Sequence, residues 1–101
     1  MANSKLTREQ KNERKEMLSM FEFAWGYFHI AYGVTLAIMP VNKMAQVSVS
    51  IMSEDGQKFR RKVGEYHALN RMNCGEYITI PADSLDPYTL DRICEAWSLT
   101  N

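Results

Sequence analysis

The sequence predicts a mixed α+β fold with a long N-terminal helix, a three-stranded antiparallel sheet and a short C-terminal helix, in the order α-β-β-β-α. Three observations carry this prediction: apolar residues recur at helical spacing between residues 8 and 32, alternate in residues 46–52, and recur at helical spacing again after Asp86. A length of 101 residues fits one domain, residues 1–101, in which residues 1–7 are expected to be a flexible N-terminus.

The first helix is expected to begin at Arg8, because Thr7 and Gln10 match a capping box. Gly33 is a suitable end cap, so the helix is expected to run to about Tyr32. Its predicted core stripe consists of Met17, Met20, Phe21, Ala24, Trp25, Phe28 and Ala31. Three further apolar residues, Phe23, Tyr27 and Ile30, lie off this stripe. They predict a surface covered by the sheet, by a partner or by a second copy of the chain in a homodimer.

Residues 46–52 alternate between apolar and small or polar side chains, which predicts a half-buried strand. We expect a three-residue loop, Glu54 to Gly56, that pairs Ile51 with Phe59 and Val47 with Val63. A two-residue loop would instead place Arg60 and Lys62 over the core. The chosen register points six side chains outward together: Ser48, Ser50, Met52, Lys58, Arg60 and Lys62.

A third strand is predicted at residues 76–80, after a turn over residues 70–75. Asp86 and Pro87 predict the N-cap and first residue of the last helix. Its core stripe is Leu90, Ile93, Cys94 and Trp97. Residues 34–39 are apolar and β-branched, and they are either a fourth strand or a continuation of the first helix.

The charges and cysteines of the chain exclude several classes of protein. Twelve Lys and Arg balance twelve Asp and Glu, which removes the whole-protein argument for a nucleic-acid or anionic-membrane partner. Two cysteines and no signal-peptide pattern predict an intracellular, cytoplasmic protein. Residues 23–41 carry no formal charge and are a weak transmembrane alternative, disfavoured by their polar side chains and by Pro40.

The sequence contains no recognisable catalytic or metal-binding motif. The two histidines and two cysteines, His29, His67, Cys74 and Cys94, do not form the close pairs of a structural zinc site. Glu65 and His67 are the one pair that suggests a general base, because alternate residues of a strand share a face. We therefore expect no enzyme activity, no cofactor and no bound metal.

Two surfaces are expected to bind partners. Lys58, Arg60 and Lys62 would stand about 6 to 7 Å apart on one strand face, near the spacing of phosphates along a nucleic-acid strand. The alternative is a charged edge strand that prevents aggregation. The second surface is Phe23, Tyr27 and Ile30.

The leading hypothesis is a non-catalytic protein-binding module that modulates or inhibits a larger host protein or nucleoprotein complex, as small viral accessory proteins do. The alternative is a nucleic-acid-binding module that uses residues 58–62.

Overall fold

The computed structural model describes residues 5–51 and 60–99, and it confirms the mixed α+β fold. The elements in chain order are α1 (Arg8–Phe23), β1 (Tyr27–Ala31), β2 (Val34–Val41), β3 (Met44–Ile51), α2 (Arg61–Asn73), β4 (Ile78–Pro81), a single 3-10 turn η1 (Ala82–Ser84) and α3 (Pro87–Ser98). The strands form a four-stranded antiparallel sheet in the order β1-β2-β3-β4. Four strands are the number that the prediction allowed, although β1 lies where the first helix was expected and α2 is an addition that the prediction lacked.

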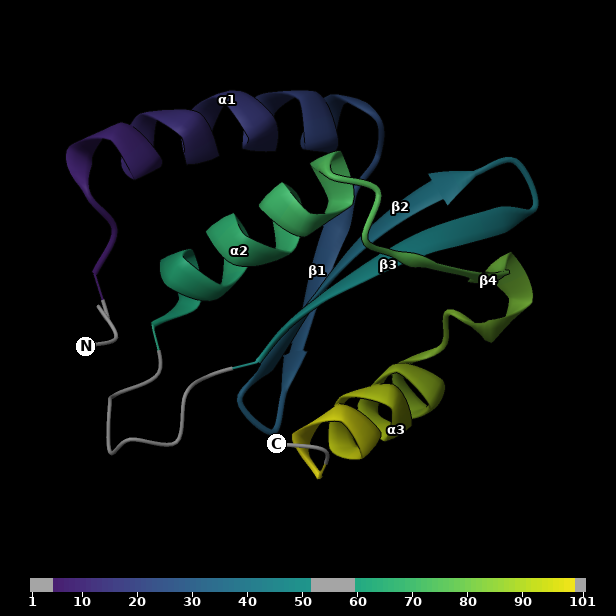
Figure 1. Ribbon diagram of the computed structural model, residues 1–101. Helices are drawn as coiled ribbons and strands as arrows, with labels where there is room; N and C mark the ends of the chain where they lie inside the picture. Colours follow the sequence, from purple (N-terminus) through teal and green to yellow (C-terminus); the bar gives the residue numbers. More distant parts are fainter. Residues whose placement is uncertain (1–4, 52–59, 100–101) are drawn as a thin grey trace.

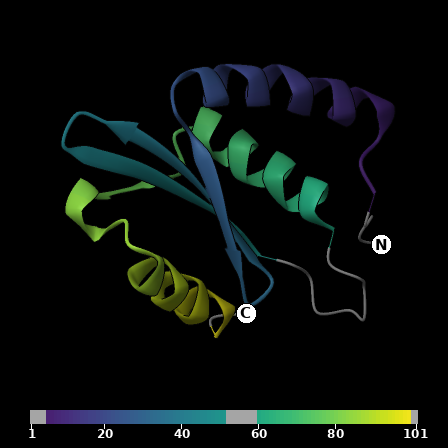
Figure 2. The same cartoon turned by 180° about the vertical axis from the view of Figure 1, so that it is seen from behind.

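Helices cover both faces of the sheet (Figures 1 and 2). On one face, α3 buries Leu90 and Cys94 against β2 and β3, in a cluster that also contains Val34, Leu36, Ile38, Ala45 and Val47. On the other face, α1 and α2 lie side by side, and their cluster contains Phe21, Ala37, Ala68, Leu69 and Met72. Because both faces are covered, the middle strands β2 and β3 are buried on both faces over most of their length, unlike the half-buried strand predicted for residues 46–52.

The start of α1 is confirmed and its end is not. The Gln10 amide donates to the Thr7 hydroxyl at 3.1 Å, and the Thr7 amide donates to the Gln10 side chain at 2.9 Å. The helix stops at Phe23, nine residues before the predicted end at Tyr32. The backbone turns at Gly26, where the added Cβ of any other residue would stand 2.5 Å from the Phe21 ring.

This early end overturns part of the predicted core stripe. Met17 and Phe21 pack in the core, but Met20 and Trp25 are exposed. Phe28 and Ala31 also contact the core, as predicted, although they do so from β1. Aromatic and aliphatic residues at this density satisfy helical and strand patterns alike, and tertiary pairing with β2 decided between them.

Residues 34–39 are part of a strand, which settles the alternative that the sequence left open. Tyr32 and Gly33 form the two-residue turn before it, with φ of 55° and 71°. Positive φ at both positions is the geometry of a type I′ turn. Residues 23–41 are thus mostly a β-hairpin, and no helix among residues 5–51 and 60–99 is long and apolar enough to cross a membrane.

The hairpin predicted between residues 47 and 63 is wrong. Val47 pairs with Ile38 on β2 and with Ile78 on β4, while Val63 belongs to α2. The predicted loop and strand residues Met52, Glu54, Asp55, Gly56, Lys58 and Phe59 lie outside the described residues. Ser48 and Ser50 are buried beneath α2 instead of facing outward. In β3 the serines face α2 and the valines face the opposite side of the sheet, so the alternation distinguishes two buried faces and not a buried face from a solvent-exposed one.

The C-terminal third follows the prediction closely. Strand β4 lies within two residues of the predicted one, although residues 70–73 continue α2 instead of forming the turn. Asp86 caps α3 by accepting a hydrogen bond from the Thr89 amide at 2.9 Å, and Pro87 is the first helical residue. The hydrogen bonds that the backbone and side chain of Thr89 donate to the Asp86 carboxyl also lower its pKa. Leu90 and Cys94 are the buried part of the predicted stripe.

Candidate functional site

A strongly basic groove lies between the first turns of α1 and the beginning of α2. It has a volume of about 770 Å³ and is open to solvent on one side. Eight of its eleven lining residues are cations: Lys5, Arg8, Lys11, Arg14, Lys15, Arg60, Arg61 and Lys62. The other three are Leu6, Asn12 and Val63, so the part of the lining that the structure describes contains no carboxylate. We call these eleven residues the basic groove.

Helical spacing builds the first wall of the groove. Arg8, Lys11 and Lys15 follow one another at i, i+3 and i+7, which puts them on one face of α1. Seven residues of helix span about 10 Å, so the wall carries a row of cations of that length. The capping box at Thr7 fixes where this row begins.

The second wall is the N-terminal end of α2. Arg60 is the N-cap residue, and its side chain makes no capping hydrogen bond to the first-turn amides. The amide end of a helix carries about half a positive charge, so it adds to the side-chain cations of Arg60, Arg61 and Lys62. An anion in the groove would therefore meet two walls of the same sign.

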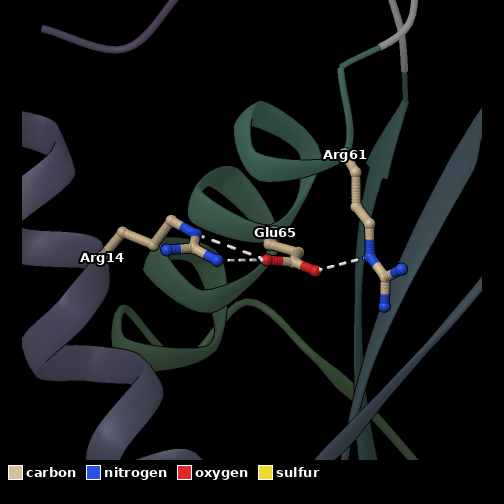
Figure 3. A network of polar contacts seen from close by, with 3 residues as sticks. All are labelled: Arg14, Arg61 and Glu65. Atoms are coloured by element: carbon tan, nitrogen blue, oxygen red, sulfur yellow. Dashed lines mark hydrogen bonds and ion pairs between the residues drawn. The ribbon is translucent and has the colours of Figure 1, made fainter.

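A buried carboxylate fixes two of the arginines (Figure 3). The side chain of Glu65 is only 6% exposed and lies between Arg14 of α1 and Arg61 at the start of α2. Arg14 Nη2 donates to Glu65 Oε1 at 2.8 Å, and Arg61 Nε donates to Glu65 Oε2 at 3.0 Å. One carboxylate shared by two guanidiniums joins the walls of the groove and leaves one of their two positive charges uncompensated.

A second carboxylate on α1 is also directed toward α2. The Tyr66 hydroxyl donates to Glu13 Oε1 at 2.8 Å. This hydrogen bond and the burial of the ring raise the pKa of Tyr66 above its ordinary value. Together with Glu65, this contact explains how helices with mixed charge leave a groove lined by cations.

The structure separates the predicted partner-binding residues into two places. Arg60 and Lys62 line the basic groove, although they do so from a helix start instead of a strand, and Lys58 lies outside the described residues. Phe23 ends α1, while Tyr27 and Ile30 belong to β1. The groove and these three residues therefore do not form one surface.

The sequence reasoning missed the cations of α1. In residues 1–16 the lysines and arginines alternate with glutamates, so this part of the sequence shows no basic run. The spacing of Arg8, Lys11 and Lys15 was the available signal, since one helix face collects them while Glu13 turns toward α2.

The predicted pair of Glu65 and His67 is not brought together on one face. Glu65 and His67 are on a helix, where residues two apart do not share a face, and Glu65 is held by arginines. Burial and the nearby Arg71 lower the pKa of His67. Among residues 5–51 and 60–99, no three His, Cys, Asp or Glu side chains are grouped so that they could hold a metal ion.

Comparison with known proteins finds no matching family model, no matching curated protein and no matching solved structure.

Proposed function

We propose that the protein is a non-catalytic binding module that holds the phosphate backbone of a nucleic acid in the basic groove. The observation that carries the proposal is the lining itself, in which eight cations from α1, α2 and the residues just before them meet, and no other described lining residue is charged. Lysine and arginine side chains that neutralise phosphates release condensed counterions, and this release drives much of non-specific nucleic-acid binding.

The neutral charge of the whole chain does not count against this proposal, because the charges are segregated. Eight of the twelve lysines and arginines line the groove. At physiological salt the screening length is about 8 Å, so a ligand in the groove responds mainly to these neighbours. The acidic C-terminal third of the chain supplies none of the lining residues.

The lining also favours backbone contacts over other modes of recognition. Among the described residues it contains no aromatic side chain on which a base could stack, and stacking is the usual means of binding unpaired bases. It contains only two apolar residues, Leu6 and Val63, whereas protein interfaces are anchored by large apolar and aromatic side chains. A ligand with regularly spaced negative charges suits the groove best.

The test is a fluorescence anisotropy titration of labelled DNA and RNA, single-stranded and duplex, at several salt concentrations. The double variant Lys11→Glu with Lys62→Glu reverses one exposed cation on each wall and should weaken binding by more than about tenfold, with a smaller salt dependence. Lys43→Glu is the control, because Lys43 is exposed in the turn between β2 and β3, outside the groove.

Three results would refute the proposal. The first is an absence of binding to every nucleic acid at low salt. The second is an equal loss of affinity in the Lys43→Glu control. The third is equally tight binding of polyglutamate, which would identify the ligand as an acidic protein surface.

A protein partner is the second candidate, and one observation favours it. Met20 and Phe23 at the end of α1 are 75% and 90% exposed, and they line a shallow hollow with Ser19 and Glu22. Exposed apolar residues at this density are typical of contact surfaces. On this reading the protein modulates or inhibits a larger complex, and Phe23→Ser should abolish capture of that complex from host cells while leaving nucleic-acid affinity unchanged.

A further inference from the structure

The outer edge of β1 presents backbone N–H and C=O groups that no strand among residues 5–51 and 60–99 pairs with. β1 is the end strand of the sheet, and β2 occupies its other side. The two-residue turn at Tyr32 and Gly33 makes Ala31 and Val34 a hydrogen-bonded pair, and such pairs alternate along an antiparallel ladder. The backbone N–H and C=O groups of Phe28 and Ile30 therefore point away from β2.

The two edges of this sheet are protected differently. β4, at the opposite end, has four residues and contains Pro81, and both features discourage a further strand. β1 has the sequence Tyr-Phe-His-Ile-Ala, without a proline, a glycine, a lysine or a carboxylate. Soluble proteins commonly protect their edges with such residues, so β1 lacks the usual means of rejecting another strand.

We propose that β1 is an interface at which a second copy of this chain adds its own β1, antiparallel, about a two-fold axis at His29. This register pairs Phe28 of each copy with Ile30 of the other. All the outward N–H and C=O groups of both residues are then used, in four hydrogen bonds across the axis. The result is a continuous eight-stranded sheet. This inference is independent of the basic groove and of its ligand.

Exposed aromatic residues at both ends of β1 fit this arrangement. Trp25, just before β1, is 83% exposed, and Tyr32, just after it, is 60% exposed. Both adopt positive φ, at 67° and 55°, where a bulky side chain is strained. Antiparallel pairing places Trp25 of one copy near Tyr32 of the other, so that four otherwise solvated rings gain contacts.

Self-complementarity distinguishes a second copy from an arbitrary extended peptide. The strand carries no lysine, arginine or carboxylate that would meet its own copy in the symmetric register, and His29 on the axis is bonded at 2.7 Å to Asp91 of its own chain. Phe28 and Ile30 lie on one face of the sheet and meet each other across the axis. Two-fold association of identical patches is also the commonest form of oligomer.

Sedimentation velocity of the full chain, without nucleic acid, provides the first test. From about 1 μM to about 1 mM, the range in which a small interface associates, the mass should rise from 11.7 kDa toward twice that value. Ile30→Lys should hold the protein monomeric throughout, because a lysine on an edge strand rejects pairing. The matched control is Ile78→Lys on the opposite edge strand, which should dimerise like wild type.

A disulfide test addresses the register and does not rely on the lysine variants. The two copies of His29 face each other as a non-hydrogen-bonded pair with Cα atoms about 4.5 Å apart, a separation that a disulfide can bridge. His29→Cys in a Cys74→Ser background should therefore give a covalent dimer on mild oxidation. Thr79→Cys on β4, in the same background, should remain monomeric. A wild-type chain that stays monomeric at every concentration would overturn the proposal, and so would cross-linking of Thr79→Cys alone.

Discussion

Arg14 and Glu65 are 51 residues apart in the sequence, yet Nε and Nη2 of the arginine lie 3.3 and 2.8 Å from the same oxygen of the glutamate. This contact joins α1 to α2, and it sets the two walls of the basic groove at a fixed separation. Because the carboxylate is almost fully buried, the ion pairs with both arginines are needed to offset the free-energy cost of burying its charge.

Arg14→Met should lower the free energy of unfolding by about 2 to 3 kcal/mol, because Glu65 would stay buried with Arg61 as its remaining ion-pair partner. The double variant Arg14→Met with Glu65→Leu should recover much of this loss, since the unpaired guanidinium that remains, Arg61, is 71% exposed and no unpaired charge is buried. Urea denaturation measures both, and Lys15→Met, a neighbouring exposed position, is the control. If the losses caused by Arg14→Met and by Glu65→Leu alone simply added up in the double variant, the energetic coupling between these two residues would be contradicted.

The elements that could be predicted from the sequence are those whose ends are marked by helix-capping residues. Thr7 with Gln10 marks the start of α1, and Asp86 with Pro87 marks the start of α3, because these signals act within one turn of helix. β1 and α2 could not be located in this way. Residues 27–31 fit either pattern, and the cations of residues 60–62 obscured the helical repeat formed by Glu65, Ala68, Leu69 and Met72.

The site was only half predictable for the same reason. The basic residues after position 57 were visible as a run, but their groove exists only because α2 packs beside α1. Arg61 shows the consequence. The predicted hairpin register, which points Arg60 and Lys62 outward, would place Arg61 against the core. In α2 its side chain is instead largely exposed and bonded to Glu65.

Alanine substitutions at two glycines, Gly26 and Gly75, should destabilise the protein for different reasons, steric crowding at the first and backbone strain at the second. Gly26→Ala should lower the free energy of unfolding by about 2 to 3 kcal/mol, because the new Cβ would collide with the buried Phe21 ring. Gly75→Ala should cost about 1 kcal/mol, because its φ of +80° is strained for alanine although nothing lies within 4 Å of the new atom. Equal losses in chemical denaturation would contradict this assignment of causes.

The two cysteines should react very differently with a thiol reagent. Burial raises the pKa of the Cys94 thiol to about 11, while Cys74 is exposed. Since the thiolate is the reactive form, one thiol per folded chain should react with Ellman's reagent at about pH 8 and the second only after denaturation. Cys74→Ser is the control, because it should remove the fast phase and leave the slow one. Two equally fast thiols in the folded protein would show that the α3 face is open.

Thr35 and Ser48 are buried hydroxyl residues on the face of the sheet that α1 and α2 cover, and they should respond to deletion with opposite signs. Ser48 Oγ donates to the Ala68 carbonyl of α2 at 2.6 Å, whereas Thr35 Oγ1 has no hydrogen-bond partner among the described residues. A buried hydroxyl without a partner loses its hydration and gains nothing in exchange. Thr35→Val keeps the shape of the side chain, so it should raise the free energy of unfolding by about 1 kcal/mol, while Ser48→Ala should lower it by a similar amount. Urea denaturation of both variants at neutral pH gives the comparison. Destabilisation by Thr35→Val would mean that a buried water or a neighbouring group bonds this hydroxyl in solution.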